Sequence, residues 1–292
     1  MKRRVALATY GRAPALAPDD QLLVPALDAL GVLAEPVVWS SHAMWTAFDA
    51  VVIRSCWDYH LHSDAFYAWL GSLETAGVPL WNPASMIRWN SDKRYLIDLE
   101  QRGVPTIHTE IVRRGRVAEV EAVVAKNGWT RFVIKPAISA SGFETYALST
   151  PLDEYSRATI ARVASSGDML VQPFAEEVPE AGELSFMFLD GEFSHAALKR
   201  AAVATGEFRV QTEHGGTVER TSPSDHLVEQ AARALAALPT VPLYARVDGI
   251  VRDDQFVLME LELIEPNLFL DLEPAAPERM ARGIVRRLTT QE

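Results

Sequence analysis

The sequence has little cysteine, a deficit of basic charge and no long apolar run. The single Cys56 excludes an intramolecular disulfide and is typical of a reducing compartment. With 28 Lys and Arg against 39 Asp and Glu, the formal net charge of -11 argues against a general affinity for nucleic acid or anionic membrane. No apolar run approaches the ~20 residues of a membrane span, and the N-terminus MKRRVALATY lacks the longer apolar stretch of a signal peptide. We therefore expect a cytoplasmic protein without a nucleic-acid or membrane partner.

The rest of the composition is that of an ordinary globular protein, with 48% hydrophobic and 23% charged residues. At 292 residues the chain is longer than a typical domain of roughly 100 to 150 residues. We therefore expect two or three subdomains around a shared cleft. The sequence leaves the oligomeric state open, with a homodimer as one candidate.

The N-terminal part alternates short apolar runs with helical patterns. The apolar runs lie at residues 5–8, 36–39 and 50–53, and the helical patterns lie at 21–30 and 64–76. This alternation predicts a small parallel α/β unit, in which ligands bind at the carboxyl ends of the strands.

Polar residues follow two of these expected strands. Tyr10, Arg54 and Asp58 stand where strand ends should lie, so we expect them to contact the substrate. The planar fork of Arg54 could anchor a carboxylate, and a structural ion pair is the alternative for this residue. For the neighbouring Trp57 and Tyr59, a place in the core is the preferred interpretation.

The later elements are predicted from the same periodicities and from glycine and proline stops. We expect helices at residues 85–102, 117–126, 224–238 and 277–288, and strands at 132–134, 169–172, 184–189, 193–199, 243–251 and 256–263. The pairs Asp190-Gly191 and Asp253-Asp254 indicate tight turns between antiparallel strands.

The segment HAALKRAAVATGEFRVQTEHGGT, at residues 195–217, concentrates basic side chains and glycines. It contains Lys199, Arg209 on an expected strand, and the pair Gly215-Gly216. Lysine supplies a point charge, arginine a fork for two oxygens, and glycine a backbone that approaches an anion closely. The segment therefore predicts a site for anionic oxygen, with a solvated basic hairpin as the alternative.

Two lysines flank a loop of small residues. Lys93 lies on the helix expected at 85–102, and Lys135 ends a strand just before Ser141 and Gly142. Small side chains let backbone donors face phosphates, so this arrangement is a plausible nucleoside triphosphate site. The loop has one glycine and lacks the Gly-Lys-Ser/Thr ending of a Walker loop, which makes it a weak signal when taken alone.

A further strand end at Gln172 leads through Phe174 to Glu176 and Glu177. The exposed backbone of such a turn could pair with an adenine edge, and an acidic side chain just beyond it could accept hydrogen bonds from ribose hydroxyls. A solvated acidic turn is the alternative.

Three carboxylates lie on the last two expected strands. Glu260 and Glu262 are two residues apart, so they point to one face, and Asp248 lies on the strand before them. Carboxylates in this arrangement suit Mg²⁺, which prefers hard oxygen ligands and bridges substrate phosphates. Two inward glutamates on the mostly apolar strand VLMELELI would be costly without a cation.

The order of these motifs resembles the ATP-grasp superfamily over nearly the whole chain from about residue 82 onward. The motifs are NPASMIRWNSDKRYLIDLEQRGVPTIHTEIV, FVIKPAISASG, MLVQPFAEE, GELSFMFLDGEFSHAALKR, GEFRVQTEHGGT, ARVDGIV and VLMELELIEPN. The branch that it resembles most contains ribosomal-protein glutamate ligases, prokaryotic glutathione synthetases and the cycloserine-forming ligase. VVIRSCWDYH and ELIEPNLFL look closest to the last of these.

The resemblance implies an α/β (α+β) ATP-grasp fold, with an N-terminal parallel α/β domain and two α+β subdomains that clasp ATP. The expected units are a substrate-side domain at 1–82, a linker helix and ATP lid at 83–175, and a catalytic subdomain at 176–292.

The resemblance also implies roles for individual residues. ATP would be held by Lys93, Lys135, Ser141, Gly142, Gln172, Phe174, Glu183, Lys199, and Glu176 or Glu177. The transferring phosphate would be held by Lys199, Arg209 and Gly216, and Mg²⁺ or Mn²⁺ by Asp248, Glu260 and Glu262. The sequence departs from the family in two ways. Glu262 stands where the family has asparagine, so Asn267 could replace it as a ligand, and the lid has fewer glycines than many members.

The expected function is that of an ATP-dependent carboxylate–amine ligase. ATP would phosphorylate the carboxylate of an amino-acid-like molecule, and a nitrogen would then displace the phosphate. Cyclisation of an O-ureidoserine-like substrate to cycloserine is the leading hypothesis. The alternatives are a ligase that forms a peptide bond, a phosphotransferase on the same fold, and a regulatory subunit that binds nucleotide without turnover.

Overall fold

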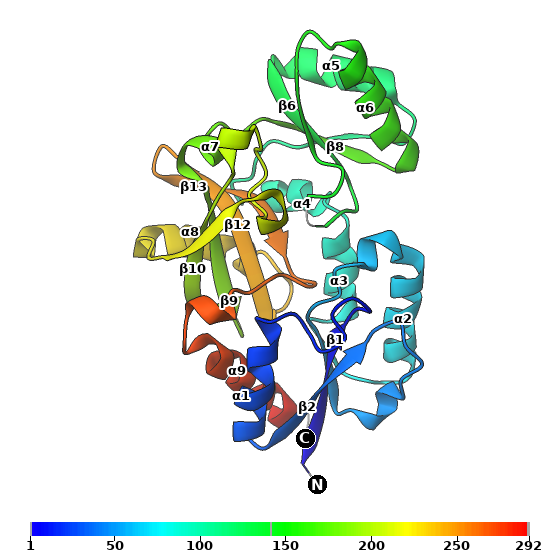
Figure 1. Cartoon of the computed structure of the whole chain (residues 1–292), viewed down its shortest axis with the longest axis vertical. Helices are drawn as coiled ribbons and strands as arrows, with labels where there is room; N and C mark the ends of the chain where they lie inside the picture. The colour runs from blue at the N-terminus through cyan, green and yellow to red at the C-terminus, as the bar shows by residue number, and fades with distance from the viewer. Residues whose placement is uncertain (1, 141, 291–292) are drawn as a thin grey trace.

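The computed structural model describes residues 2–140 and 142–290, which form three β-sheets arranged along the long axis of the molecule (Figure 1). The four-stranded N-terminal sheet lies at one end, a five-stranded sheet in the middle and another four-stranded sheet at the other end. Within these residues no helix has both the length and the apolar character needed to cross a membrane.

The N-terminal sheet is parallel and has the order β2-β1-β3-β4, which confirms the predicted α/β unit. Its strands are β1 (Arg3–Thr9), β2 (Val32–Val38), β3 (Ala50–Ile53) and β4 (Leu80–Trp81), with the helices α1 (Leu23–Ala29) and α2 (Ser63–Thr75). All four residues of β3 are buried, as the covered faces of a parallel sheet require.

The linker contains two helices, so the prediction of one continuous helix at 85–102 is wrong. These are α3 (Ala84–Ser91) and α4 (Tyr95–Gln101). The chain leaves the helical conformation at Asp92, whose carboxylate accepts a hydrogen bond from the Arg94 backbone N–H at 3.0 Å. The Lys93 backbone N–H donates instead to the Ala137 carbonyl at 2.8 Å. The break therefore places Lys93 against the loop that follows β6 (Arg131–Pro136).

The sheet at the far end is antiparallel and has the order β5-β8-β6-β7. Its strands are β5 (Glu110–Val112), β6 (Arg131–Pro136), β7 (Tyr146–Ser149) and β8 (Met169–Pro173). The helices α5 (Val117–Asn127) and α6 (Glu154–Ser166) share a core with it. The sequence predicts α5, β6 and β8 but not β5, β7 or α6.

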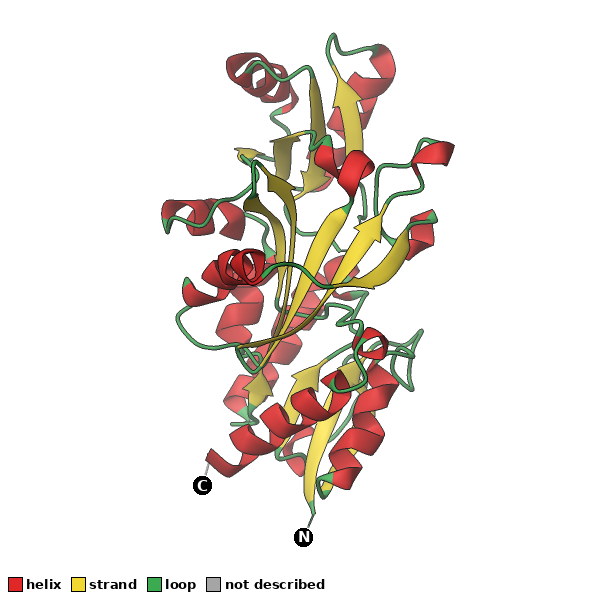
Figure 2. Ribbon diagram, turned by 90° about the vertical axis from the view of Figure 1, so that its left-hand side faces the viewer, coloured by secondary structure: helices red, strands yellow, loops and turns green. Residues whose placement is uncertain are grey.

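The middle sheet has five antiparallel strands in the order β11-β10-β9-β12-β13, and Figure 2 shows its twist. Its strands are β9 (Glu183–Leu189), β10 (Glu192–Arg200), β11 (Thr217–Thr221), β12 (Tyr244–Arg252) and β13 (Gln255–Glu262), accompanied by α7 (Glu177–Ala181) and α8 (Asp225–Ala236). The predicted turns are confirmed. Asp190, Gly191, Asp253 and Asp254 all have positive φ, as tight hairpins require.

The last helix, α9 (Ala276–Thr290), packs against α1 of the N-terminal unit as well as against β9 and β10 of the middle sheet (Figure 1). Leu23 and Leu27 of α1 share one buried cluster with Met280 and Ile284 of α9. The N-terminal and middle sheets therefore have a common core.

Candidate active site

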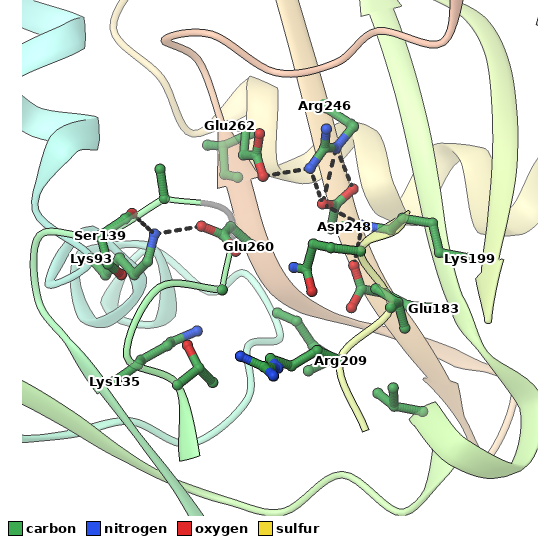
Figure 3. Close-up of a pocket in the computed structure, with 18 of the residues that line it drawn as sticks. Lys93, Lys135, Ser139, Glu183, Lys199, Arg209, Arg246, Asp248, Glu260 and Glu262 are labelled. Carbon is green, nitrogen blue, oxygen red and sulfur yellow. Dashed lines mark hydrogen bonds and ion pairs between the residues drawn. The ribbon is translucent and has the colours of Figure 1, made fainter. Parts of the chain in front are cut away.

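Residues from all three parts of the chain line a pocket of about 230 Å³ (Figure 3). One part of its wall is apolar and includes Ile107, Val133, Phe174, Val210 and Met259. A second part is charged, and a third, the aromatic corner, consists of Trp57, Tyr59 and Glu265. The pocket thus combines an apolar wall with a dense set of ionisable groups.

Asp248 on β12 lies at the centre of the charged wall. Its carboxylate accepts hydrogen bonds from Lys199 Nζ of β10 at 2.9 Å and from Arg246 Nη2 at 2.9 Å. Burial raises the pKa of Asp248, but Arg246 and Lys199 outweigh it and hold the pKa below its usual range. Lys199 also contacts Glu183 of β9, and Arg246 contacts Glu262 of β13. Alternation along the strands brings these groups to one face.

Lys93, at the break between α3 and α4, reaches the same wall from the other side. Its Nζ donates to Glu260 Oε1 at 2.6 Å and to the Ser139 carbonyl at 2.9 Å. Lys135 on β6 is half-buried, and within the described part of the chain it has neither a hydrogen bond nor an ion pair (Figure 3). Burial lowers the pKa of Lys135, and the nearby Glu260 acts in the opposite direction. Lys135 is therefore a cation available to an anionic ligand.

Two further carboxyl groups lie where the charged wall meets the aromatic corner. Burial raises the pKa of Glu262 to about 7, against the effect of Arg246. Burial also raises the pKa of Glu265 well above its usual range, and Glu262 adds to this shift. The pKa of Tyr59 rises through burial first and through the negative charge of Glu265 next. Burial therefore favours the protonated, neutral form of these two carboxyl groups as long as no cation is bound beside them.

The predicted metal ligands line the pocket, and each has a basic partner. Asp248 and Glu260 are opposite each other on β12 and β13, with Glu262 two residues further on. In the described residues, no group of three or more His, Cys, Asp or Glu side chains has the arrangement of a metal site. The donor type nevertheless fits Mg²⁺, because hard carboxylate oxygens are its preferred protein ligands. Asn267 also lines the pocket, so both versions of the predicted ligand set are present there.

Most of the residues predicted for the nucleotide and phosphate meet at this pocket. Those in its lining are Lys93, Lys135, Gly142, Gln172, Phe174, Glu183, Lys199 and Arg209. Gln172 is held by a hydrogen bond from its Nε2 to Thr109 Oγ1 at 2.9 Å. Ser141 lies outside the described residues.

Glu176 and Glu177 are outside the pocket lining. Glu176 pairs with Arg131 at 2.9 Å, and Glu177 pairs with Arg252 at 2.6 Å. Contact of either carboxylate with a ribose stays a prediction, and it would require the arginine partner to be released.

The three predicted substrate residues are also outside the lining. Arg54 is 0% exposed, donates to Asp20 Oδ1 at 2.8 Å and to the Pro266 carbonyl at 2.7 Å, and lies over the Tyr244 ring. Arg54 therefore belongs to a buried structural ion pair with Asp20, which is the alternative to substrate contact that the sequence left open. Asp58 accepts from Trp39 Nε1 at 2.8 Å, and the Tyr10 ring packs beside Trp57. Direct contact of Asp58 or Tyr10 with substrate stays a prediction.

The basic segment differs from its prediction in two respects. Arg209 lies in an irregular loop, not on a strand, and Glu207 holds its guanidinium through bonds of 2.9 and 2.8 Å. The backbone N–H groups of Gly215 and Gly216 donate to the Thr212 and Gln211 carbonyls. The expectation that this glycine pair offers free N–H groups to an anion is therefore wrong. A Cβ on Gly216 would lie 2.2 Å from the Val210 carbonyl oxygen, so the glycine serves close packing.

Arg246, Tyr59 and Glu265 are among the pocket residues that sequence reasoning missed. Arg246 is two residues from Asp248 on the same strand, so the alternation that identified the carboxylates also identifies it. Tyr59 was assigned to the core, and it is 4% exposed but also lines the pocket. Glu265 follows the last strand in an irregular loop, where the sequence has no periodic signal.

Comparison with solved structures identifies the class of fold. An ATP-grasp RimK domain protein from Sphaerobacter thermophilus DSM 20745 matches with a TM-score of 0.71 at 18% identity, covering 97% of this chain and 99% of that chain. A D-alanine–D-alanine ligase from Bacillus anthracis matches with a TM-score of 0.68 at 14% identity, covering 99% of this chain and 100% of that chain. The chain has the ATP-grasp fold.

More similar relatives identify the family. The N-terminal domain model of the D-cycloserine synthetase DcsG matches residues 5–82. The cycloserine biosynthesis protein DcsG of Streptomyces lavendulae is 32% identical over 289 residues, covering 93% of this chain and 95% of that protein. The crystal structure of D-cycloserine synthetase DcsG matches with a TM-score of 0.89 at 28% identity, covering 98% of this chain and 99% of that chain. The chain belongs to the DcsG family of ATP-grasp ligases, and it is an ATP-dependent enzyme that forms a C–N bond.

Proposed function

We propose that the protein cyclises an O-ureidoserine-like amino acid to cycloserine at the expense of ATP. The observation that carries this proposal is the aromatic corner. Trp57 and Tyr59 belong to the segment that matches the DcsG N-terminal domain, and they close the pocket next to the charged wall. A small amino acid placed in this corner would have its carboxylate beside the basic groups that could hold a phosphoryl group.

ATP would lie between the apolar wall and the charged wall. The apolar side chain of Phe174 and the backbone near Gln172 would receive the adenine, and Glu183 would face the nucleotide. Lys135 and Lys93 would hold the phosphates, Lys135 at once and Lys93 in exchange for part of its contact with Glu260.

Mg²⁺, or Mn²⁺ in its place, would be held by Asp248, Glu260 and Glu262, with Asn267 as the alternative to Glu262. When bound, the ion neutralises charge on the phosphates of ATP. This assignment is supported by three pocket-lining carboxylates on adjacent strands, whose mutual repulsion a cation would relieve.

In the first step the substrate carboxylate would attack the γ-phosphorus, and ADP would leave. Lys199, Arg209 and Arg246 are the cations that would surround the acyl phosphate. A nitrogen of the same molecule would then attack the acyl carbon and expel inorganic phosphate, which closes the ring. Loss of the carbamoyl group on that nitrogen to water would complete cycloserine. No step needs a nucleophilic side chain, and burial raises the pKa of the Cys56 thiol well above its usual value.

The test is an assay of the purified protein with ATP, Mg²⁺ and O-ureidoserine. We expect ADP and free phosphate in equal amounts, together with cycloserine detected by mass spectrometry. A phosphorylated amino acid as the final product would indicate a phosphotransferase. Turnover that requires a second amine would indicate a ligase that joins two molecules, and either result would contradict the proposal.

A further inference from the structure

Glu265 differs from the acidic residues on the strands of the pocket. Glu183, Asp248, Glu260 and Glu262 each contact a basic side chain. Glu265 lines the pocket and is only 9% exposed, yet in the described part of the chain its carboxyl group has no hydrogen bond and no ion pair. A buried carboxylate without a partner is costly, so its retention in a binding pocket points to a ligand that completes it.

The loop that carries Glu265 is fixed in place by its backbone. Five consecutive carbonyl oxygens, those of residues 264–268, each accept a hydrogen bond from a side chain that lies elsewhere in the chain. The donors are Tyr244 Oη at 2.7 Å, Trp57 Nε1 at 3.0 Å, Arg54 Nη2 at 2.7 Å, Arg246 Nη1 at 3.0 Å and His195 Nε2 at 2.9 Å. The backbone that carries the Glu265 side chain is therefore fixed before any ligand arrives, which reduces the entropic cost of binding.

The surroundings of Glu265 suit a cation. Trp57 lines the pocket from the N-terminal unit, and its indole N–H already donates to the Glu265 carbonyl. Tyr59 is 4% exposed, lines the same pocket, and its hydroxyl has no hydrogen bond within the described residues. Aromatic faces and a carboxylate together recognise an ammonium group.

We propose that Glu265, with Trp57 and Tyr59, binds the α-ammonium group of the amino-acid substrate and so selects amino acids over their deamino analogues. This inference rests on the proposed function, because it concerns the acceptor side of the same pocket. It assigns Arg54 a positioning role, since Arg54 holds the loop at the Pro266 carbonyl and is itself held by Asp20.

The test compares two probes that differ only in the amino group, O-ureidoserine and 3-(ureidooxy)propanoate. Their affinities are measured by calorimetry at saturating Mg²⁺ and non-hydrolysable ATP analogue, with the wild type and with Glu265→Gln. We expect the wild type to prefer the amino acid at least about tenfold, the range of one charge-assisted contact. Glu265→Gln should lose this preference and keep its affinity for the deamino probe within about twofold.

Two controls separate binding from a structural effect. Asp271, like Glu265, lies between β13 and α9, but it is exposed and outside the pocket lining. Asp271→Asn should therefore leave both affinities unchanged. The free Glu265→Gln protein should melt at about the same temperature as the wild type, because the amide keeps the shape of the buried carboxyl group and no hydrogen bond or ion pair of the described residues is lost. A marked loss of stability would indicate a structural role.

Three outcomes would overturn the inference. These are an unchanged preference in Glu265→Gln, an equal loss of affinity for both probes, and a higher Mg²⁺ requirement with the preference intact. Failure of the proposed function looks different, since the wild type would then bind O-ureidoserine without forming cycloserine. A wild type that binds neither probe would contradict both.

Discussion

Charged groups on the strands of the pocket and charged groups on its loops are held in different ways. Asp248, Lys199 and Arg246 lie on β10 and β12, are 10% exposed or less in their side chains, and form one ion-pair network. Arg209 lies on a loop, its side chain is 26% exposed, and its partner Glu207 is two residues away. The strand network joins distant parts of the chain, whereas the loop pair is local.

This difference separates the groups that fix the site from those that can respond to a ligand. A buried network has one satisfied arrangement, and breaking it leaves a charge without a partner. The loop pair is more exposed than the strand network and joins two neighbours of one loop, so opening it costs less. A Cβ on Gly142 would lie 3.3 Å from both Arg209 Cδ and Gln211 Oε1, so the loop that carries Arg209 lies close to the loop that contains Gly142. Four predictions test this comparison.

The largest effect is expected on the strands, at Glu260. Glu260→Gln keeps the shape of the side chain and can still accept a hydrogen bond from Lys93 Nζ, but it removes the charge proposed to hold Mg²⁺. Turnover should fall roughly 1000-fold, the range seen when one transition-state contact is removed. Initial rates at saturating Mg²⁺ and a thermal melt check this. Near-normal turnover with an intact fold would move the metal site elsewhere.

The next effect concerns stability. Arg246→Met leaves Asp248 with Lys199 as its remaining cation and Glu262 with none, so the free energy of unfolding should fall by about 3 kcal/mol. Glu207→Gln, which breaks the loop pair, is the matched control and should change it by less than about 0.5 kcal/mol. Denaturant unfolding measures both. Equal losses in the two variants would remove the distinction between strands and loops.

Nucleotide affinity tests Lys135, which forms no ion pair or hydrogen bond with the other described residues. Lys135→Ala removes this charge from the pocket, so ADP binding should weaken about tenfold or more, or roughly 1.5 to 3 kcal/mol. Lys126→Ala is a suitable control, because that lysine pairs with Glu110 on the surface of the far subdomain. Unchanged ADP affinity by calorimetry would show that Lys135 does not contact the phosphates.

The smallest effect is expected on the loop. Arg209→Lys keeps the charge but loses the fork, so turnover should fall about tenfold while ADP affinity stays within about twofold. An interaction that forms only as charge moves to the substrate changes turnover and leaves ground-state binding unchanged. Loss of ADP affinity with turnover preserved at saturation would make Arg209 an ATP ligand instead.

The same comparison explains what the sequence could predict. Strand alternation and apolar runs place Lys135, Lys199, Asp248, Glu260 and Glu262 in the pocket, because a period of two fixes which face a residue takes. The orientation of Arg54 depends on Asp20, which lies 34 residues away in sequence, and no local pattern records that contact. The break in the helix at Lys93 is not predicted for a similar reason. The Lys93 backbone N–H donates to the carbonyl of Ala137, which lies in the loop after β6.

Most of the sequence-based predictions that differ from the structure concern residues in loops. The sequence predicts a strand at Arg209, whereas in the structure Glu207 binds the guanidinium of Arg209 within an irregular loop. The amides of Gly215 and Gly216 serve their own turn, a use that a glycine pair does not distinguish from anion binding. The sequence does not place Glu265 in the pocket. Its loop is held by hydrogen bonds from five side chains at distant positions in the sequence, and no local pattern records these contacts.

The packing of α9 on α1 has a consequence for how the chain folds as it is made. Leu23 and Leu27 of α1 are buried partly by Met280 and Ile284, which are synthesised much later. The N-terminal sheet can pair its strands early, but one of its helices has an unfinished apolar face until α9 has been made. The order of synthesis is therefore not the order in which this core is completed, and a nascent chain halted before α9 exposes that face to chaperones.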